Sequence, residues 1–316
     1  MSDHSLSRRR MLAVTVSGMA AAGLMRPARA ASSGEPSGPF RYCLNTGTIR
    51  GHKIPIDQEV DVAARAGYQA IEPWIEHVNR YRESGASLAD LKKKIAGLGL
   101  TVESAIGFPR WAVDDEKVRA EGLDQMKRDM ETVAAIGGKR IAAPPAGING
   151  GPAGMDLRRI AERYRAVCEL GDQMGVIAEL EIWGPSQNVS RLADAAFVTI
   201  DCGHPKACLL PDVYHMYRGG SDFHGLKLLS GAAIQVFHMN DYPADPPREK
   251  ARDSDRVYPG DGIAPLDQIL RDLAAKGSVI VLSLELFNPT YHKQDVNEVA
   301  RTGLAKMKAA VEKALS

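Results

Sequence analysis

The sequence has few cysteines, almost no net charge and no CxxC motif, and these absences exclude several classes of protein. Cys43, Cys168, Cys202 and Cys208 lack paired spacing, which argues against a structural zinc knuckle or a disulfide framework. Cys202 and Cys208 are candidates for a bridge in an oxidising compartment, although free thiols are the favoured interpretation. The formal net charge of +1 gives no electrostatic reason to expect nucleic acid as a partner.

The first thirty residues have the three parts of an export signal. A twin-arginine pattern over 7–12 precedes an apolar stretch over 13–24, and the small-residue motif Ala28-Arg29-Ala30 follows. The apolar stretch is too short, and too rich in Gly and Ala, to span a bilayer, and no other stretch is long and apolar enough. We therefore expect a periplasmic or secreted protein with no membrane span, whose mature chain starts near residue 31 with a flexible lead-in over 31–39.

The rest of the chain alternates short runs of strand type with longer segments of helical period. The runs of strand type are 40–45, 69–72, 101–106, 140–143, 176–181, 197–201, 234–238 and 279–285. Amphipathic segments over 56–66, 88–98, 117–136, 157–174, 265–275 and 296–314 predict helices. Several of these segments end in a glycine directly before the next run, as at Gly67 and Gly175, where a helix commonly stops.

This alternation predicts parallel strands joined by right-handed crossovers. Eight such units favour an α/β fold, a single-domain (β/α)8 TIM barrel over 40–316, which matches the usual size of about 250 residues. An open, doubly wound sheet is disfavoured because the sequence CLNTGTIRG after the first run lacks the GxGxxG pattern of dinucleotide-binding folds.

Polar side chains follow the runs of strand type in the second half of the chain. Glu181, Asp201, His238 and Glu285 each stand at the end of a separate run, where the active sites of such barrels are found. Three carboxylates and an imidazole suit one divalent cation bound mainly through oxygen, such as Mn, Mg or Co, and Zn is also compatible. Because a buried carboxylate without a partner is costly, a shared cation would stabilise Glu181 and Glu285.

The motifs ELEIWG, DCGH, HMND, YPGDG and SLELF, in this order and spacing, resemble the sugar phosphate isomerase/epimerase superfamily of xylose-isomerase-like barrels. That group includes D-tagatose 3-epimerase, hydroxypyruvate isomerase and inosose dehydratase. The resemblance covers essentially the whole mature chain and is specific in the last four strands. It implies that Glu181, Asp201, His238 and Glu285 hold one divalent metal and that Glu181 and Glu285 act as opposed acid and base. It also implies that His204, in a D-x-x-H pattern, contacts the substrate.

Four further residues have plausible positions for contact with a sugar. Glu72 and Trp74 follow the second run, and Trp183 lies two residues past Glu181, where it is placed to stack on a sugar face. Either tryptophan is equally compatible with packing alone. Arg256 lies in the long segment 240–261, which we expect to act as a lid. It is a candidate for binding a hydroxyl or an anionic group, and a solvated loop charge is the alternative.

Together with these residues, the resemblance implies a metal-dependent isomerase or epimerase of a small-molecule carbohydrate: a free sugar, keto-sugar or keto-polyol. A cation would stabilise an enediolate, and two carboxylates would move the proton. A non-phosphorylated substrate is favoured because no Gly-rich phosphate cradle follows the last two runs and because of the export signal. Two alternatives stay open: a lyase or dehydratase acting on a keto-sugar, an inosose or a 3-keto-glycoside, and an exported carbohydrate-binding protein without turnover. A homo-oligomer is compatible with the resemblance.

Overall fold

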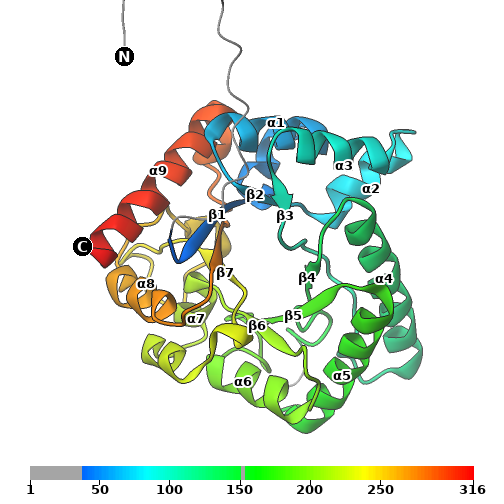
Figure 1. Cartoon of the computed structure of the whole chain (residues 1–316). Helices are drawn as coiled ribbons and strands as arrows, with labels where there is room; N and C mark the ends of the chain where they lie inside the picture. The colour runs from blue at the N-terminus through cyan, green and yellow to red at the C-terminus, as the bar shows by residue number, and fades with distance from the viewer. Residues whose placement is uncertain (1–37, 151–153) are drawn as a thin grey trace, which may run out of the picture. The chain divides into compact units, whose positions relative to one another are not determined.

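The computed structural model describes residues 38–150 and 154–316. The predicted export signal over 1–30 and nearly all of the lead-in over 31–39 lie outside the described residues. Within the described part, a ring of parallel strands is surrounded by helices, as Figure 1 shows. The predicted barrel is therefore confirmed. None of the helices in these two ranges has the length and apolarity needed to cross a membrane.

The strands follow one another in chain order around the ring and pair within two sheets. They are β1 (Phe40–Asn45), β2 (Ala70–Glu72), β3 (Thr101–Val102), β4 (Arg140–Ala142), β5 (Ile177–Glu181), β6 (Cys208–Leu210), β7 (Val236–Met239) and β8 (Ile280–Leu284). One sheet has the order β3-β2-β1-β8-β7 and the other has the order β4-β5-β6. The ring closes between them because the Ala142 N–H donates to the Ala105 carbonyl at 2.9 Å and because Asp212 forms a bridge with His238.

Helices cover the outside of this ring. They are α1 (Ile56–Ala66), α2 (Ile75–Glu83), α3 (Leu88–Gly97), α4 (Glu116–Ala135), α5 (Leu157–Met174), α6 (Leu192–Asp201), α7 (Val213–Arg218), α8 (Leu266–Ala274) and α9 (Val296–Leu315). Helix α5 shows why they form. Asp156 caps its start by accepting from the Arg158 N–H, Ile160, Tyr164 and Val167 form one buried stripe, and Gly175 ends it at φ 68°.

One predicted strand is wrong, and this error moves two of the predicted site residues. Residues 197–201 are the second half of α6 and not the sixth strand. Leu192, Ala195 and Val198 bury one face at helical spacing, whereas Phe197 and Ile200 are exposed. The β-branched residues that suggested a strand thus lie on a helix, and the sixth strand is the later, shorter run β6.

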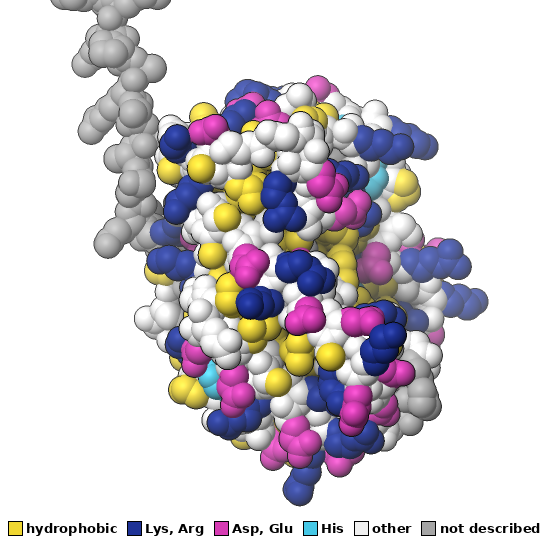
Figure 2. All heavy atoms as spheres, turned by 90° about the vertical axis from the view of Figure 1, so that its right-hand side faces the viewer, with side chains coloured by type: hydrophobic (Ala, Val, Ile, Leu, Met, Phe, Trp, Pro, Cys, Tyr) yellow, Lys and Arg dark blue, Asp and Glu magenta, His cyan; other side chains and the backbone are white. Residues whose placement is uncertain are grey.

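The state of the cysteines and the distribution of surface charge agree with what the composition suggests. All four cysteines are buried free thiols. On the face shown in Figure 2, Lys and Arg side chains are interspersed with Asp and Glu side chains, as the net charge of +1 suggests. This face offers no extended region of one charge sign.

Candidate active site

Three of the four predicted metal ligands meet at the carboxyl ends of the strands. Glu181 ends β5, His238 lies in β7 and Glu285 directly follows β8, and all three side chains are buried. Each offers one ligand atom, and these atoms lie within 4.8 Å of one another. His238 Nδ1 is 3.3 Å from Glu285 Oε2 and 3.8 Å from Glu181 Oε1. The barrel thus brings together residues that are distant in the sequence.

The prediction that Asp201 is the fourth metal ligand is wrong. The prediction that His204, three residues later, contacts the substrate is wrong as well. Asp201 is exposed at the last position of α6. His204 lies just beyond this helix, with Nε2 3.1 Å from an oxygen of Asp172 on α5. Both residues lie outside the site because residues 197–201, predicted as the sixth strand, belong to helix α6.

Asp212 takes the place that the prediction gave to Asp201. It follows β6 closely, and its Oδ2 is 3.8 Å from His238 Nδ1. His215, three residues later, lines the cavity above the site. A D-x-x-H pattern therefore occurs twice, at 201–204 and at 212–215. In the structure only the second follows a strand, Cys208–Leu210, and every residue of that strand is buried.

Glu72 lies next to His238 but has a different role from the predicted one. It is fully buried, and its two oxygens are 3.1 and 3.3 Å from His238 Nε2. The Ser283 hydroxyl donates to it at 2.6 Å. A carboxylate accepts hydrogen bonds, so His238 Nε2 donates its proton to Glu72, and Nδ1 faces Glu181 and Glu285. Glu72 therefore orients the imidazole, as carboxylates beside metal-binding histidines commonly do, and does not face the substrate cavity.

Arg256 reaches the centre of the site from the long segment 240–261. Its side chain is fully buried, and Nη1 donates to Asp212 Oδ2 and Glu285 Oε2, both at 2.9 Å. Its Nη2 lies 3.1 Å from His215 Nε2. Arg256 also lines the cavity, so the alternative of a solvated loop charge is wrong.

A divalent cation fits the charge and the unused donors of this cluster. Four buried carboxyl groups, those of Glu72, Glu181, Asp212 and Glu285, lie around His238, and two of them, Asp212 and Glu285, also pair with the permanent cation of Arg256. Within the described residues, His238 Nδ1 and Glu181 Oε2 are buried atoms without a hydrogen-bond partner. Such atoms are rare unless something else satisfies them. Glu181, Asp212, His238 and Glu285 would hold the cation through three carboxylates and one nitrogen.

The two glutamates of this set have opposite pKa shifts. Burial raises the pKa of Glu181 well above its usual value; His238 opposes the shift, whereas Glu285 adds to it. Burial also acts to raise the pKa of Glu285, but His238 and Arg256 outweigh it and lower that pKa to about 2. Pairs of carboxyl groups with divergent pKa values are typical of acid and base partners.

A cavity of about 520 Å³ opens above these residues. Its walls contain Trp74 and Trp183, two of the predicted sugar contacts, and also Phe108 and Phe287, which the sequence did not single out. The Trp74 ring centroid is 5.2 Å from that of Phe108 and 5.9 Å from that of Phe287. The volume suits a small ligand, and aromatic faces beside a few polar groups are typical of ligand pockets.

Comparisons with known proteins agree with this fold and site. Residues 60–310 match the family described as xylose isomerase-like TIM barrel. The inosose isomerase of Bacillus velezensis is 27% identical over 278 residues, which cover 87% of this chain and 98% of that protein. The fructoselysine 3-epimerase of Escherichia coli O157:H7 is 25% identical over 277 residues, or 82% of this chain and 95% of that protein.

A solved structure gives the same result for the fold. The protein named IOLI, described with a bound zinc atom, superposes with a TM-score of 0.80 at 24% identity, covering 87% of this chain and 99% of that one. The family match extends over most of the chain, and the curated relatives are named isomerases and epimerases. This chain therefore belongs to the xylose isomerase-like TIM-barrel family and is an enzyme of the isomerase and epimerase kind.

Proposed function

We propose that this protein is a divalent-metal-dependent isomerase or epimerase of a non-phosphorylated sugar, keto-sugar or keto-polyol. One observation carries the proposal. Glu181 and Glu285 come from different strands, line the same cavity, and each place an oxygen within 3.8 Å of His238 Nδ1. Two carboxyl groups on one cavity are the arrangement that proton removal and return require, whereas sugar binding without turnover has no need of it.

The residues of the site divide the chemistry between them. A bound cation would polarise the substrate carbonyl and stabilise the negative charge of an enediolate. Both oxygens of Glu285 accept hydrogen bonds, Oε1 from Asn45 and Oε2 from Arg256, which keep this group ionised and fixed. Glu181 Oε2 has no partner among the described residues and is available to exchange a proton. Proton return to the opposite face gives epimerisation, and return to the neighbouring carbon gives isomerisation.

Two arguments support a substrate without phosphate. The curated relatives are named for inosose and fructoselysine, and neither name specifies a phosphate group. The twin-arginine pattern at the start of the sequence also indicates a protein that meets free sugars outside the cytoplasm. The aromatic walls of the cavity are suited to the apolar faces of a sugar ring.

A lyase or dehydratase is the second candidate, because His215 lines the same cavity outside the proposed ligand set. An imidazole there supplies a further acid–base group beside the two glutamates. Release of water or of an aglycone from a keto-sugar, an inosose or a 3-keto-glycoside would distinguish elimination from isomerisation.

The test is the exchange of substrate α protons with solvent, followed by NMR in deuterated water. The protein is loaded with Mn or Co and given a panel of free ketoses, inososes and 3-keto-glycosides. We expect exchange by the unaltered protein and a loss of at least about 100-fold in Glu181→Gln and in Glu285→Gln, because each removes one proton-transfer group. In Glu285→Gln the metal affinity should fall only in part.

A matched control is His204→Gln, since His204 lies beside Asp172 on the outer helices, away from the cavity. This variant should keep the exchange rate. Exchange at the original rate in both glutamine variants would show that the acid–base assignment is wrong. Faster turnover of a sugar phosphate than of every neutral analogue would reject the non-phosphorylated substrate.

A further inference from the structure

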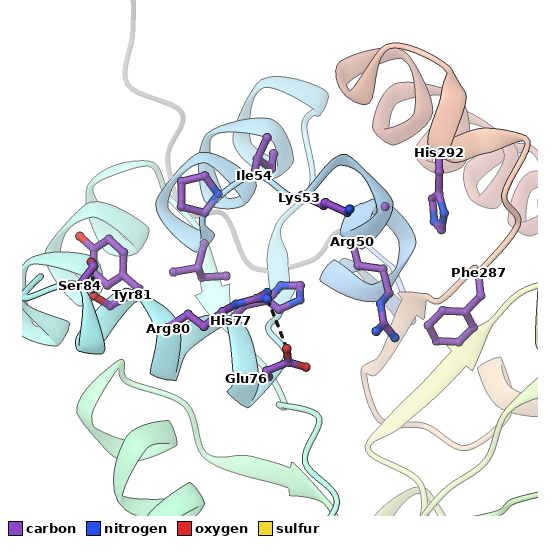
Figure 3. Close-up of a pocket in the computed structure, with 13 residues that line it drawn as sticks. Arg50, Lys53, Ile54, Glu76, His77, Arg80, Tyr81, Ser84, Phe287 and His292 are labelled. Atoms are coloured by element: carbon purple, nitrogen blue, oxygen red, sulfur yellow. Dashed lines mark hydrogen bonds and ion pairs between the residues drawn. The ribbon is translucent and has the colours of Figure 1, made fainter.

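A second hollow of about 760 Å³ adjoins the active-site cavity. It lies between η1 (Thr46–His52), α2 and the segment after β8, and Figure 3 shows the side chains around it. Arg50 and Phe287 line both this hollow and the active-site cavity, so the two spaces meet at these residues. The reaction proposed above makes no use of this hollow.

The wall of the hollow carries an excess of positive charge. Arg50 and Lys53 are exposed and form no ion pair within residues 38–150 and 154–316. The acidic residue in this wall, Glu76, is already paired with Arg80 at 3.3 Å, as the dashed line in Figure 3 marks. His77, a further lining residue, is bound by the buried Glu59 at 2.9 Å. Two cations therefore remain available to an anion.

The Arg50 guanidinium and the Lys53 backbone are both held at defined positions. The Arg50 guanidinium stacks over Trp74, with Cζ 4.3 Å from the ring centroid, which keeps it at the junction of the two spaces. Lys53 has φ 54°, in the left-handed region that residues other than glycine rarely adopt. Its backbone N–H donates to the Arg50 carbonyl at 3.1 Å, and this contact joins the two cationic residues in one turn.

The hollow is too large and too apolar for a small anion alone. Ile54, Pro55, Ile56 and Tyr81 form part of its wall together with the charged residues. A ligand that fits must therefore combine an apolar body with a negative charge, and it must continue from the reacting sugar past Arg50.

We propose that this hollow is a second substrate subsite, which receives a bulky carboxylate-bearing substituent attached to the sugar, with Arg50 and Lys53 pairing its carboxylate. The inference rests on the proposed function only for the sugar part of the ligand. It makes the substrate a substituted sugar, such as a keto-glycoside with an acidic aglycone, and not a free monosaccharide.

The experiment compares the affinities of two probes that differ in charge but not in shape. These are 4-carboxyphenyl β-D-glucopyranoside and its neutral amide analogue, 4-carbamoylphenyl β-D-glucopyranoside, titrated calorimetrically into the Mn-loaded protein. We expect the carboxylate to bind about fivefold more tightly than the amide, because each pairing with an exposed cation contributes modestly. Lys53→Gln should reduce this ratio to about twofold, and 0.5 M NaCl should reduce it as well.

The control is Lys293→Gln, since Lys293 is an exposed lysine of η5 (Tyr291–Lys293) that does not line the hollow. It should keep the fivefold ratio. Equal affinities for the two probes, failure of either probe to bind, or an unchanged ratio in Lys53→Gln would overturn the subsite. Absence of α-proton exchange on every ketose, inosose and 3-keto-glycoside of the panel, with the carboxylate preference intact, would instead overturn the proposed function and leave the subsite standing.

Discussion

At the residue scale, Asp212 shows how one side chain positions two parts of the site. It is the N-cap of α7, and its Oδ1 accepts from the His215 N–H at 2.7 Å. Its Oδ2 accepts from Asn240 at 2.8 Å and from Arg256 at 2.9 Å. The D-x-x-H spacing is thus the spacing of a helix cap. Asp201, at the last position of its helix, is not placed to form this cap.

Asp212 and Asp201 form a matched pair for testing the ligand set. We expect Asp212→Asn to weaken Mn binding by about 100-fold, because it removes one carboxylate from a buried cation site. Asp201→Asn should leave the affinity within about twofold, since its exposed side chain lies on an outer helix. Competition with a chelating dye measures both values. A large loss in Asp201→Asn with none in Asp212→Asn would restore the ligand set predicted from the sequence.

The positions of individual site residues could be predicted from the sequence, whereas their contacts could not. Glu181, His238 and Glu285 stand at or near the end of apolar runs, and each run proved to be a strand. The partner of Glu72 was not predictable, because the contact with His238 joins residues 166 positions apart and depends on closure of the barrel. A polar residue after a strand indicates the site, whereas its contacts there depend on neighbours from other strands.

At the scale of elements, the predicted helices and strands were correct where a single hydrophobic period dominates the segment. Segments 56–66 and 157–174 have the same bounds as α1 and α5. Segment 197–201 failed because its β-branched residues match a strand, although α6 buries one face at helical spacing. The sixth strand itself has only three residues, Cys208–Leu210, too few for any periodic pattern to show.

Two helical glycines allow an element-scale prediction. A Cβ at Gly122 in α4 would lie 2.6 Å from the backbone of Arg110, in the loop that carries the cavity residue Phe108. We expect Gly122→Ala to lower the free energy of unfolding by about 1 to 3 kcal/mol, because the helix or the loop must move. Urea unfolding followed by circular dichroism measures the change.

Gly97, at the end of α3, is the matched control, since a Cβ there meets nothing within 4 Å. Gly97→Ala should raise the free energy of unfolding by about 0.5 to 1 kcal/mol, because alanine loses less backbone entropy on folding. Destabilisation by both substitutions to the same extent would contradict the contact between α4 and the Arg110 loop.

At the scale of the whole molecule, barrel closure places the charges that define the site. Strands β2 and β5 and the segments that directly follow β6 and β8 bring four buried carboxyl groups into one cluster around His238 of β7. Arg256 joins this cluster from the segment 240–261. Its contacts could not be predicted from the sequence because this segment has no regular hydrophobic period. Part of the fold's stability therefore depends on how this negative charge is compensated.

Removal of the metal should lower the stability of the whole barrel. A ligand that binds only the folded state at 100 times its dissociation constant stabilises it by about 2.7 kcal/mol. For a domain of this size, we expect a chelator to lower the thermal midpoint by about 5 to 10 °C, and Mn, Co or Zn to restore it. Asp201→Asn should show the full shift and Asp212→Asn a much smaller one, because only Asp212 lies beside His238. Equal midpoints with and without chelator, in protein shown to contain metal beforehand, would mean that Arg256 and His238 compensate the buried carboxylates without a metal cation.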